Sequence, residues 1–207
     1  MSKLTLYTNP WSRGRIARWM LEEVGQPYEA VVISYEKDIK SPDYLAINPM
    51  GKVPALKHGD VVITEVAAIC AHLADQFPDK DLAPPVDSPL RGSYYRWLFF
   101  IAGPLEMATT ATAFNWEITE KSASSIGSGR VSDVMGTLES ALKKGPYLCG
   151  DQFTVADLLL ASNLGWGMQF KTIEPRPVFS EYVERIQARP AHKRATELDD
   201  ALAPIPG

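Results

Sequence analysis

A Pro- and Asp-rich segment, FPDKDLAPPVDSP at residues 77–89, divides the chain into two halves with different apolar patterns. Before it, short strand-like segments alternate with helical ones; after it, every apolar pattern has the three- to four-residue spacing of a helix. The segment itself has no apolar periodicity, which is typical of a linker. The sequence therefore predicts two domains, residues 1–77 and 88–207, joined by a linker at 78–87.

The first half has the pattern of a small sheet with helices packed on it. Apolar alternation or short apolar runs predict strands at 3–8, 28–33, 53–57 and 61–64. Helical spacing predicts helices at 12–24 and 65–76 and a short helical turn at 42–47. The order is strand–helix–strand followed by a hairpin and a helix, which builds one sheet covered by helices.

The second half is predicted to be entirely helical. The expected helices are 88–116, 124–144, 154–169 and 178–189, with a turn at 122–130 between the first two. Thr154 and Asp157 have the spacing of a capping box, and Phe153 and Leu158 are placed to form the accompanying hydrophobic staple. A helix is therefore expected to begin directly after Thr154.

Composition excludes several classes of function. The chain is 45% hydrophobic and 22% charged, with a net charge of −4, so it lacks the basic surface expected of a protein that binds nucleic acid or an anionic membrane. No apolar signal core and no long uninterrupted apolar run is present. Cys70 and Cys149 have no disulfide-framework or CxxC spacing, which favours a reducing cytoplasm, and no metal site is expected.

Two positions in the first half could bind a peptide-like ligand. Val53-Pro54 precedes a strand, and a cis bond there would leave the backbone of Val53 free to pair with an extended peptide; a Pro at the start of an edge strand is the alternative. Glu65 lies where a strand leads into a helix, whose amides could bind a carboxylate while Glu65 meets an ammonium group. The alternative is that Glu65 does no more than complement the helix dipole.

Ser12 is a candidate for the chemistry itself. It follows the first strand, where its hydroxyl could donate a hydrogen bond to a thiolate bound at the helix start, or serve only as an N-cap.

Three segments of the first half together resemble the N-terminal domain of cytosolic glutathione transferases: LTLYTNPWSRGRIARWMLEEVGQPYE, DYLAINPMGKVPAL and ITEVAAICAHLAD. In the second half, RWLFFIAGPLE and YLCGDQFTVADLLLA resemble the helical domain of the same family. The similarity is greatest to bacterial and fungal members with Ser or Cys after the first strand. It implies an α/β thioredoxin-like N-terminal domain followed by an all-α C-terminal domain.

The resemblance also implies roles for individual residues. Glutathione would be the co-substrate, with its cysteinyl part on Val53 beside a cis Pro54 and its γ-glutamyl end at Glu65 and Val66. Its glycyl carboxylate would be reached by Lys37 or Lys40, and the loop length leaves open which one. The remaining implied positions are Lys52 for glutathione, and Trp11, Phe100, Gly103, Met107, Thr110 and Phe114 for the electrophile, which would lie between the domains.

Two departures from the family pattern bear on this site. Val66 stands where the family usually has Ser, which removes one hydroxyl from the γ-glutamyl carboxylate. The catalytic position is also open: Ser12 fits the serine-type spacing, while Tyr7 followed by Arg13-Gly14-Arg15 resembles the tyrosine-type motif with two extra residues. Packing within the strand is the other role for Tyr7.

The resemblance thus implies a cytoplasmic, homodimeric glutathione S-transferase with a role in detoxification. It would activate the glutathione thiol as a thiolate that attacks a small apolar electrophile. A glutathione-dependent peroxidase or isomerase, and a stress-associated binding protein with little turnover, are the alternatives. No Cys lies at positions 8–15, which argues against disulfide exchange through a protein thiol.

Overall fold

The computed structural model describes residues 2–203, which form two compact units. The first contains the chain up to Lys80 together with the chain from Ala188 onward, and the second contains Asp81–Gln187. Because the last helix groups with the first unit, the two units do not coincide with the expected domains 1–77 and 88–207. None of the helices in this described part of the chain is long and apolar enough to span a bilayer.

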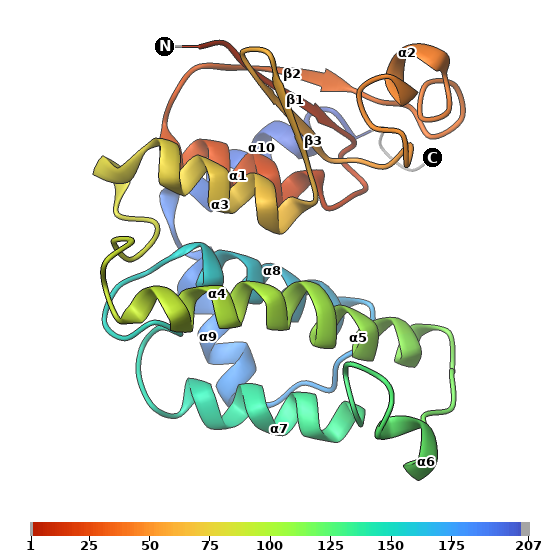
Figure 1. The fold of residues 1–207 in the computed structure, drawn as a ribbon, viewed down its shortest axis with the longest axis vertical. Helices are drawn as coiled ribbons and strands as arrows, with labels where there is room; N and C mark the ends of the chain where they lie inside the picture. The colour runs from red at the N-terminus through yellow and green to blue at the C-terminus, as the bar shows by residue number, and fades with distance from the viewer. Residues whose placement is uncertain (1, 204–207) are drawn as a thin grey trace. The chain divides into compact units, whose positions relative to one another are not determined.

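The first unit is built on a four-stranded sheet in the order β2-β1-β3-β4 (Figure 1). Its strands are β1 (Leu4–Thr8), β2 (Tyr28–Val32), β3 (Ala55–His58) and β4 (Val61–Thr64). β1 pairs in parallel with β2 and antiparallel with β3, and β3 forms a hairpin with β4. The mixed sheet and the helical second unit confirm the predicted thioredoxin-like and all-α fold classes.

Both faces of this sheet are covered. Helices α1 (Gly14–Val24) and α3 (Val66–Gln76) lie side by side on one face, where Leu4 and Leu6 of β1 are buried (Figure 1). Toward the other face, Tyr7 packs against a cluster of Ile33, Ile39 and Tyr44, the last from the short helix α2 (Pro42–Leu45). A 3₁₀ turn, η1 (Pro78–Lys80), ends this part of the unit.

The helix α10 (Pro190–Asp200) groups with the first unit, where it packs on α1. Arg18 of α1 and Asp199 of α10 form an ion pair of 2.7 Å, with side chains only 3% and 0% exposed. Arg189 binds Glu23 with two hydrogen bonds, of 2.6 and 2.8 Å. α10 has no broad apolar stripe, so its sequence did not indicate its partner.

The second unit is a bundle whose central helix, α8 (Val155–Gln169), is buried along most of its length. The predicted capping box is confirmed: the Thr154 amide donates to Asp157 Oδ2 at 2.9 Å. Five further elements are α5 (Glu106–Ala113), α6 (Glu120–Ala123), α7 (Val131–Leu142), α9 (Pro177–Gln187) and α4 (Leu90–Phe100). The helix predicted from 124 begins at Val131, after α6 and a turn.

The helix predicted at 88–116 is interrupted by a π-helical segment, η2 (Ile101–Leu105). Pro104 lies inside this segment and has no amide hydrogen to donate, which accounts for the irregular turn. The wider turn shifts the helix register on either side of it. At the end of α4, directly before this segment, Phe99 is 75% exposed and Phe100 is half-buried.

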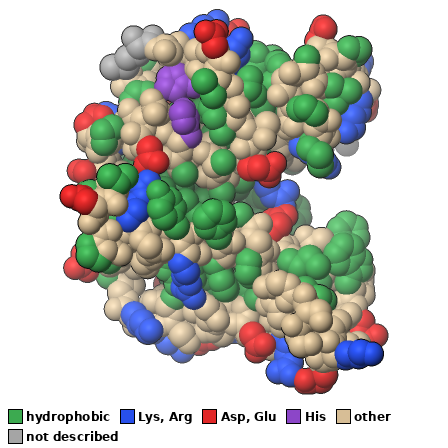
Figure 2. Space-filling view, in the orientation of Figure 1, with side chains coloured by type: hydrophobic (Ala, Val, Ile, Leu, Met, Phe, Trp, Pro, Cys, Tyr) green, Lys and Arg blue, Asp and Glu red, His purple; other side chains and the backbone are tan. Residues whose placement is uncertain are grey.

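A histidine pair lies between β3 and α3 of the first unit (histidines are purple in Figure 2). His58 Nδ1 lies 3.0 Å from His72 Nε2, so one ring must donate and the other accept. Burial, followed by the nearby His58, lowers the pKa of His72. The unfolded chain, with an ordinary histidine pKa of about 6.5, therefore binds a proton more readily than the folded one.

We therefore expect the contribution of this pair to stability to be complete above about pH 6.5 and to be lost as the pH falls further. Urea unfolding at several pH values will show this as a decrease in the free energy of unfolding. His72→Gln should remove this pH dependence of the free energy of unfolding. His192→Gln, which alters the histidine beside Trp19, should keep it. An unchanged slope in His72→Gln would contradict the assignment.

Candidate functional site

Sheet register brings three of the predicted site segments to one edge of the first unit. Ala55, the first residue of β3, pairs with Tyr7 of β1 on one side and with Thr64 of β4 on the other. The residues directly before Ala55 and directly after Tyr7 and Thr64 must therefore lie at the same edge of the sheet. Val53, Ser12 and Glu65 belong to these three segments.

Val53 offers an unpaired backbone at this edge. The bond between Val53 and Pro54 is cis, which confirms that prediction. Since β3 begins only at Ala55, Val53 lies outside the strand ladder, and within residues 2–203 neither its N–H nor its C=O is hydrogen-bonded. An extended peptide could therefore add its own backbone here as a short strand.

The loop that leads to Val53 is held by side chains from α2 and the residues after it. The Tyr44 hydroxyl and Asn48 Nδ2 both donate to the carbonyl of Lys52, at 2.7 and 2.8 Å. Burial raises the pKa of Tyr44 to about 12, with a smaller effect from Tyr7, so Tyr44 remains a donor at neutral pH. The Lys52 side chain itself is exposed, so only its backbone is fixed.

Lys37 and Lys40 differ in how firmly they are placed. Lys40 Nζ donates to the carbonyl of Met50 at 2.9 Å, which positions its ammonium group beside this loop. Gly51 has φ +57°, and a Cβ there would lie 2.7 Å from the carbonyl oxygen of Ile39, so the loop requires glycine. The Lys37 side chain is exposed and has no partner among the described residues.

Glu65 has an unusual backbone conformation at the start of α3, with φ 65° and ψ 114°. Such a conformation costs a non-glycine residue about 1–3 kcal/mol and is typical of functional sites. The Glu65 carbonyl accepts from Ile69, and no side chain caps the helix, so the amides of Val66, Ala67 and Ala68 are left without a capping side chain. These amides and the helix dipole can bind an anion.

Ser12 lies at the start of α1 and is only 8% exposed. Its hydroxyl donates to the Asn9 carbonyl at 2.7 Å and accepts from the Gly14 amide at 2.8 Å. Arg13, and not Ser12, is the N-cap residue of α1, and no side chain caps this helix. The Ser12 hydroxyl must turn away from Asn9 before it can donate to a ligand. The Ser12 amide makes no hydrogen bond within the described chain and is a second donor at the same place.

The two other aromatic candidates of the first unit have different environments. The Tyr7 ring packs against Tyr44 with ring centroids 6.0 Å apart and belongs to the cluster on the α2 side of the sheet. Trp11 is 59% exposed, although its amide is fixed by a 2.9 Å hydrogen bond to Asn9 Oδ1. The Tyr7 ring thus packs within this cluster, whereas the Trp11 ring is exposed.

The residues of the second unit that were expected to contact the electrophile differ in how far they are exposed. Phe100 is half-buried and packs edge-on against Trp97, with centroids 5.5 Å apart. Phe114 is 68% and Met107 is 36% exposed, and Gly103 is exposed as well. Thr110 is half-buried on the same helix as Met107.

No group of three or more potential metal ligands is found among residues 2–203. Burial raises the pKa of both cysteine thiols, that of Cys149 to about 11, so neither is a reactive thiolate at neutral pH.

Comparison with known proteins identifies the family. Residues 6–81 match the glutathione S-transferase N-terminal domain, and residues 102–190 match its C-terminal domain. Glutathione S-transferase GstA of Escherichia coli O157:H7 is 30% identical over 204 residues, which cover 97% of this chain and 98% of that protein. The chain therefore belongs to the glutathione S-transferase family of enzymes.

Two solved structures support the same assignment. A glutathione transferase from Methylococcus capsulatus is 32% identical with a TM-score of 0.79, covering 96% of this chain and 99% of that one. A sphingomonad glutathione S-transferase, solved in complex with glutathione, is 28% identical with a TM-score of 0.77 and covers 96% of this chain and all of that one, at 100%.

Proposed function

We propose that this protein is a glutathione transferase that binds glutathione at the sheet edge formed by Val53, Glu65 and the start of α1. The observation that carries this proposal is the unpaired backbone of Val53 next to an uncapped helix N-terminus. Glutathione is a short peptide with an ammonium group and carboxylates at its ends. Its backbone can therefore pair with that of Val53, and a carboxylate can bind the amides at the N-terminus of α3.

Each end of the tripeptide has a matching group in this arrangement. The cysteinyl part pairs with the Val53 backbone, which directs the thiol along the sheet edge toward Ser12. The γ-glutamyl carboxylate binds the first amides of α3, and Glu65 accepts its ammonium group. Lys40, which is already held beside the loop, and the exposed side chains of Lys37 and Lys52 bind the glycyl carboxylate.

To activate the thiol, the site must bind the thiolate more favourably than the neutral thiol, and the free energy needed is modest. A free thiol has a pKa near 8.5, and lowering it by about two units takes about 2.7 kcal/mol. A hydrogen bond to a charged group contributes about 1.5–3 kcal/mol, and a helix N-terminus about 0.3–1 kcal/mol. The hydroxyl or amide of Ser12 at the start of α1 is therefore sufficient without a separate base.

Replacing Ser12 by Ala should lower kcat/KM for glutathione conjugation by about 10- to 150-fold, because one hydrogen bond to the thiolate is lost. Steady-state kinetics with 1-chloro-2,4-dinitrobenzene will measure this. Ser12→Thr keeps the hydroxyl and is the matched control, and unfolding curves will separate the loss of the hydrogen bond from the Gly14 amide, about 1 kcal/mol, from the loss of catalysis. Unchanged kinetics in Ser12→Ala would transfer the role to Tyr7 or to backbone amides such as that of Ser12.

Val66 offers a test of the γ-glutamyl position. It is half-buried at the first position of α3, where a Ser would add a hydroxyl beside the uncapped amides. We expect Val66→Ser to tighten glutathione binding about fivefold, corresponding to about 1 kcal/mol, as measured by calorimetric titration. Val66→Thr should behave similarly and Val66→Ala should not; equal affinities in all three would contradict this placement.

The thiolate would then attack a small apolar electrophile. On the helical unit, the residues offered for its binding are Phe100, Gly103, Met107, Thr110 and Phe114. On the first unit, the exposed ring of Trp11 is the residue offered for its binding. Peroxide reduction or isomerisation through the same thiolate, and ligand binding with little turnover, are the alternatives. Turnover assays with cumene hydroperoxide and 1-chloro-2,4-dinitrobenzene separate them, since only a conjugating enzyme consumes glutathione without oxidising it.

We further propose a cytoplasmic homodimer in which residues 1–77 bind glutathione, 78–87 are the linker and 88–207 carry the electrophile site, with α10 packed on α1. Exposed apolar side chains on β4 and α4 support association, among them Val61, Tyr95 and Phe99. Light scattering coupled to size exclusion will measure the mass: twice 22.9 kDa is expected, and 22.9 kDa would contradict the dimer.

A further inference from the structure

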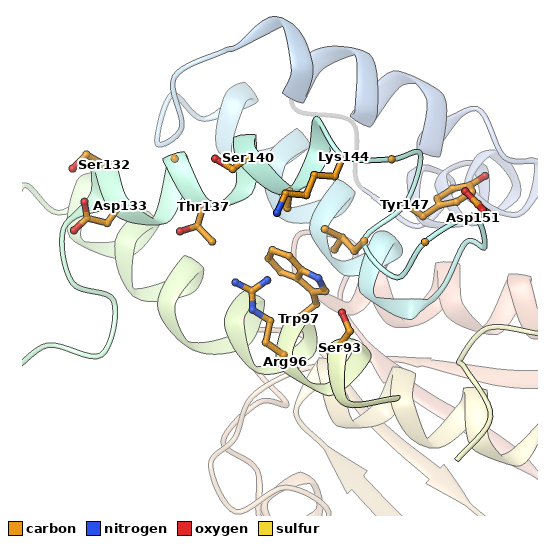
Figure 3. A pocket seen from close by; sticks show the side chains of 15 residues that line it. Ser93, Arg96, Trp97, Ser132, Asp133, Thr137, Ser140, Lys144, Tyr147 and Asp151 are labelled. Atoms are coloured by element: carbon orange, nitrogen blue, oxygen red, sulfur yellow. The ribbon is translucent and has the colours of Figure 1, made fainter. Parts of the chain in front are cut away.

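Polar groups that the fold alone does not explain lie in both units. In the second unit, Arg96 and Lys144 point toward each other across a cavity of about 850 Å³ between α4 and α7, but none of its lining residues belongs to the proposed glutathione site (Figure 3). In the first unit, the buried hydroxyl of Thr8 lies beside Ser12, the residue proposed to contact the thiol. Thr8 therefore bears directly on the proposed chemistry.

The Thr8 side chain points to the face of the sheet that α1 and α3 cover. Thr8 is the last residue of β1, and strand alternation places it on the same face as Leu4 and Leu6, which are buried there. Its side chain is fully buried, at 0% exposed, and among residues 2–203 its Oγ1 has no hydrogen-bond partner. A buried hydroxyl without a partner destabilises a fold, so its presence requires a reason other than packing.

Gly14, the first residue of α1, lets this hydroxyl approach Ser12. Thr8 Oγ1 lies 1.9 Å from the point where a Cβ of Gly14 would be, and Ser12 Oγ lies 2.9 Å from the same point. The φ angle of Gly14 is not positive, so the close approach explains why a side chain is absent here. The two hydroxyls therefore lie against the same glycine at the first turn of α1.

Ser12 can accept one more hydrogen bond than it does now. One lone pair of its oxygen accepts from the Gly14 amide at 2.8 Å, while its proton is donated to the Asn9 carbonyl at 2.7 Å. When that proton turns to a thiolate, the second lone pair is still available to a donor. Thr8 has an unused hydroxyl proton, so the two side chains are complementary.

We propose that Thr8 is a positioning residue of the thiol site, whose hydroxyl donates to Ser12 Oγ while Ser12 donates to the thiolate of glutathione. Each hydrogen bond in such a chain polarises the next, so Ser12 becomes a stronger donor. The pKa of the bound thiol then falls further than it would with Ser12 alone. This role rests on the proposed function, and Thr8 itself does not touch the thiol.

The test follows the ultraviolet absorbance of the thiolate against pH in glutathione complexes of the intact chain. Thr8→Val removes the hydroxyl and keeps the shape of the side chain. We expect it to raise the pKa of the bound thiol by about half a unit relative to the wild type. Turnover at saturating glutathione should accordingly fall about threefold at pH 5.5, where the thiol is mostly protonated, and stay nearly unchanged at pH 8.5.

Two further variants separate the hydroxyl of Thr8 from its packing. Thr8→Ser keeps the hydroxyl and should keep the wild-type pKa of the bound thiol. Thr5→Val makes the same change at a buried threonine on the opposite face of β1 and should also leave that pKa unchanged. Thr8→Val should unfold at the wild-type temperature or above it, because the hydroxyl it removes has no partner. A lower unfolding temperature would make the hydroxyl a structural group and overturn the proposal.

A double variant shows whether Thr8 acts through Ser12. Adding Thr8→Val to Ser12→Ala should not change the pKa of the bound thiol any further, since the chain of hydrogen bonds is already broken. A further rise in that background, or a wild-type thiol pKa in Thr8→Val alone, would overturn the role of Thr8 and leave the proposed function standing. A wild-type protein that does not bind glutathione, or that leaves its thiol pKa at the free value, would overturn both.

Discussion

Replacing Asp157 by Ala is expected to lower the free energy of unfolding by at least about 3 kcal/mol. The carboxylate of this residue is fully buried and accepts hydrogen bonds from the Leu148 amide at 2.8 Å, the Thr154 amide at 2.9 Å and the Tyr182 hydroxyl at 2.7 Å. The substitution leaves all three donors unsatisfied, at about 1–3 kcal/mol each. It also removes the capping box of α8, the helix at the centre of the bundle.

Urea unfolding followed by circular dichroism will measure this loss. Asp157→Asn keeps one acceptor oxygen and should be less severe. Asp151→Ala, which removes an exposed acid from the same loop, should stay within about 0.5 kcal/mol of the wild type. If Asp157→Ala and Asp151→Ala were equally stable, the carboxylate would not organise the bundle as described.

Replacing Arg18 by Met is expected to cost about 3–5 kcal/mol, because it leaves the buried carboxylate of Asp199 without its partner. The pair joins α1 to α10, and both side chains are almost fully buried. Burial raises the pKa of Asp199, and Arg18 opposes that shift. Without Arg18 the carboxylate of Asp199 will protonate more readily in the folded state. The decrease in the free energy of unfolding caused by Arg18→Met should therefore become smaller as the pH falls.

A double variant shows whether the pair stabilises the fold or only determines where α10 packs. Arg18 Nη2 and Asp199 Oδ2 are buried without partners in the described chain, so the pair is incompletely satisfied. We therefore expect Arg18→Met/Asp199→Leu to recover most of the stability lost in Arg18→Met. Unfolding curves of the two single variants and the double variant give the coupling energy. Purely additive losses would contradict the interpretation.

The sequence was most informative where local chemistry determines structure. Apolar alternation located the four strands within two residues, and the Thr154–Asp157 spacing located the start of α8. Each of these two features depends on neighbouring residues, so its signal is contained in a short segment. The cis bond before Pro54 is present as well, but the residues alone left it open and only the family resemblance implied it.

Features that depend on distant residues were missed. The placement of α10 on α1 rests on ion pairs between residues about 180 positions apart, such as Arg18 with Asp199. The positive φ of Glu65 has no signal in its residue type, because a glutamate is uncommon in that region. The interruption of the helix predicted at 88–116 was missed for another reason, because its signal, Gly103-Pro104, is local and visible in the sequence.

The central claim is that the protein binds glutathione and stabilises its thiolate at the start of α1. The most direct test follows the ultraviolet absorbance of the thiolate against pH in the glutathione complex of the wild type and of Ser12→Ala. We predict that the bound thiol ionises about two units below its free pKa in the wild type. Absence of glutathione binding, or a bound thiol that titrates like the free one, would contradict the claim.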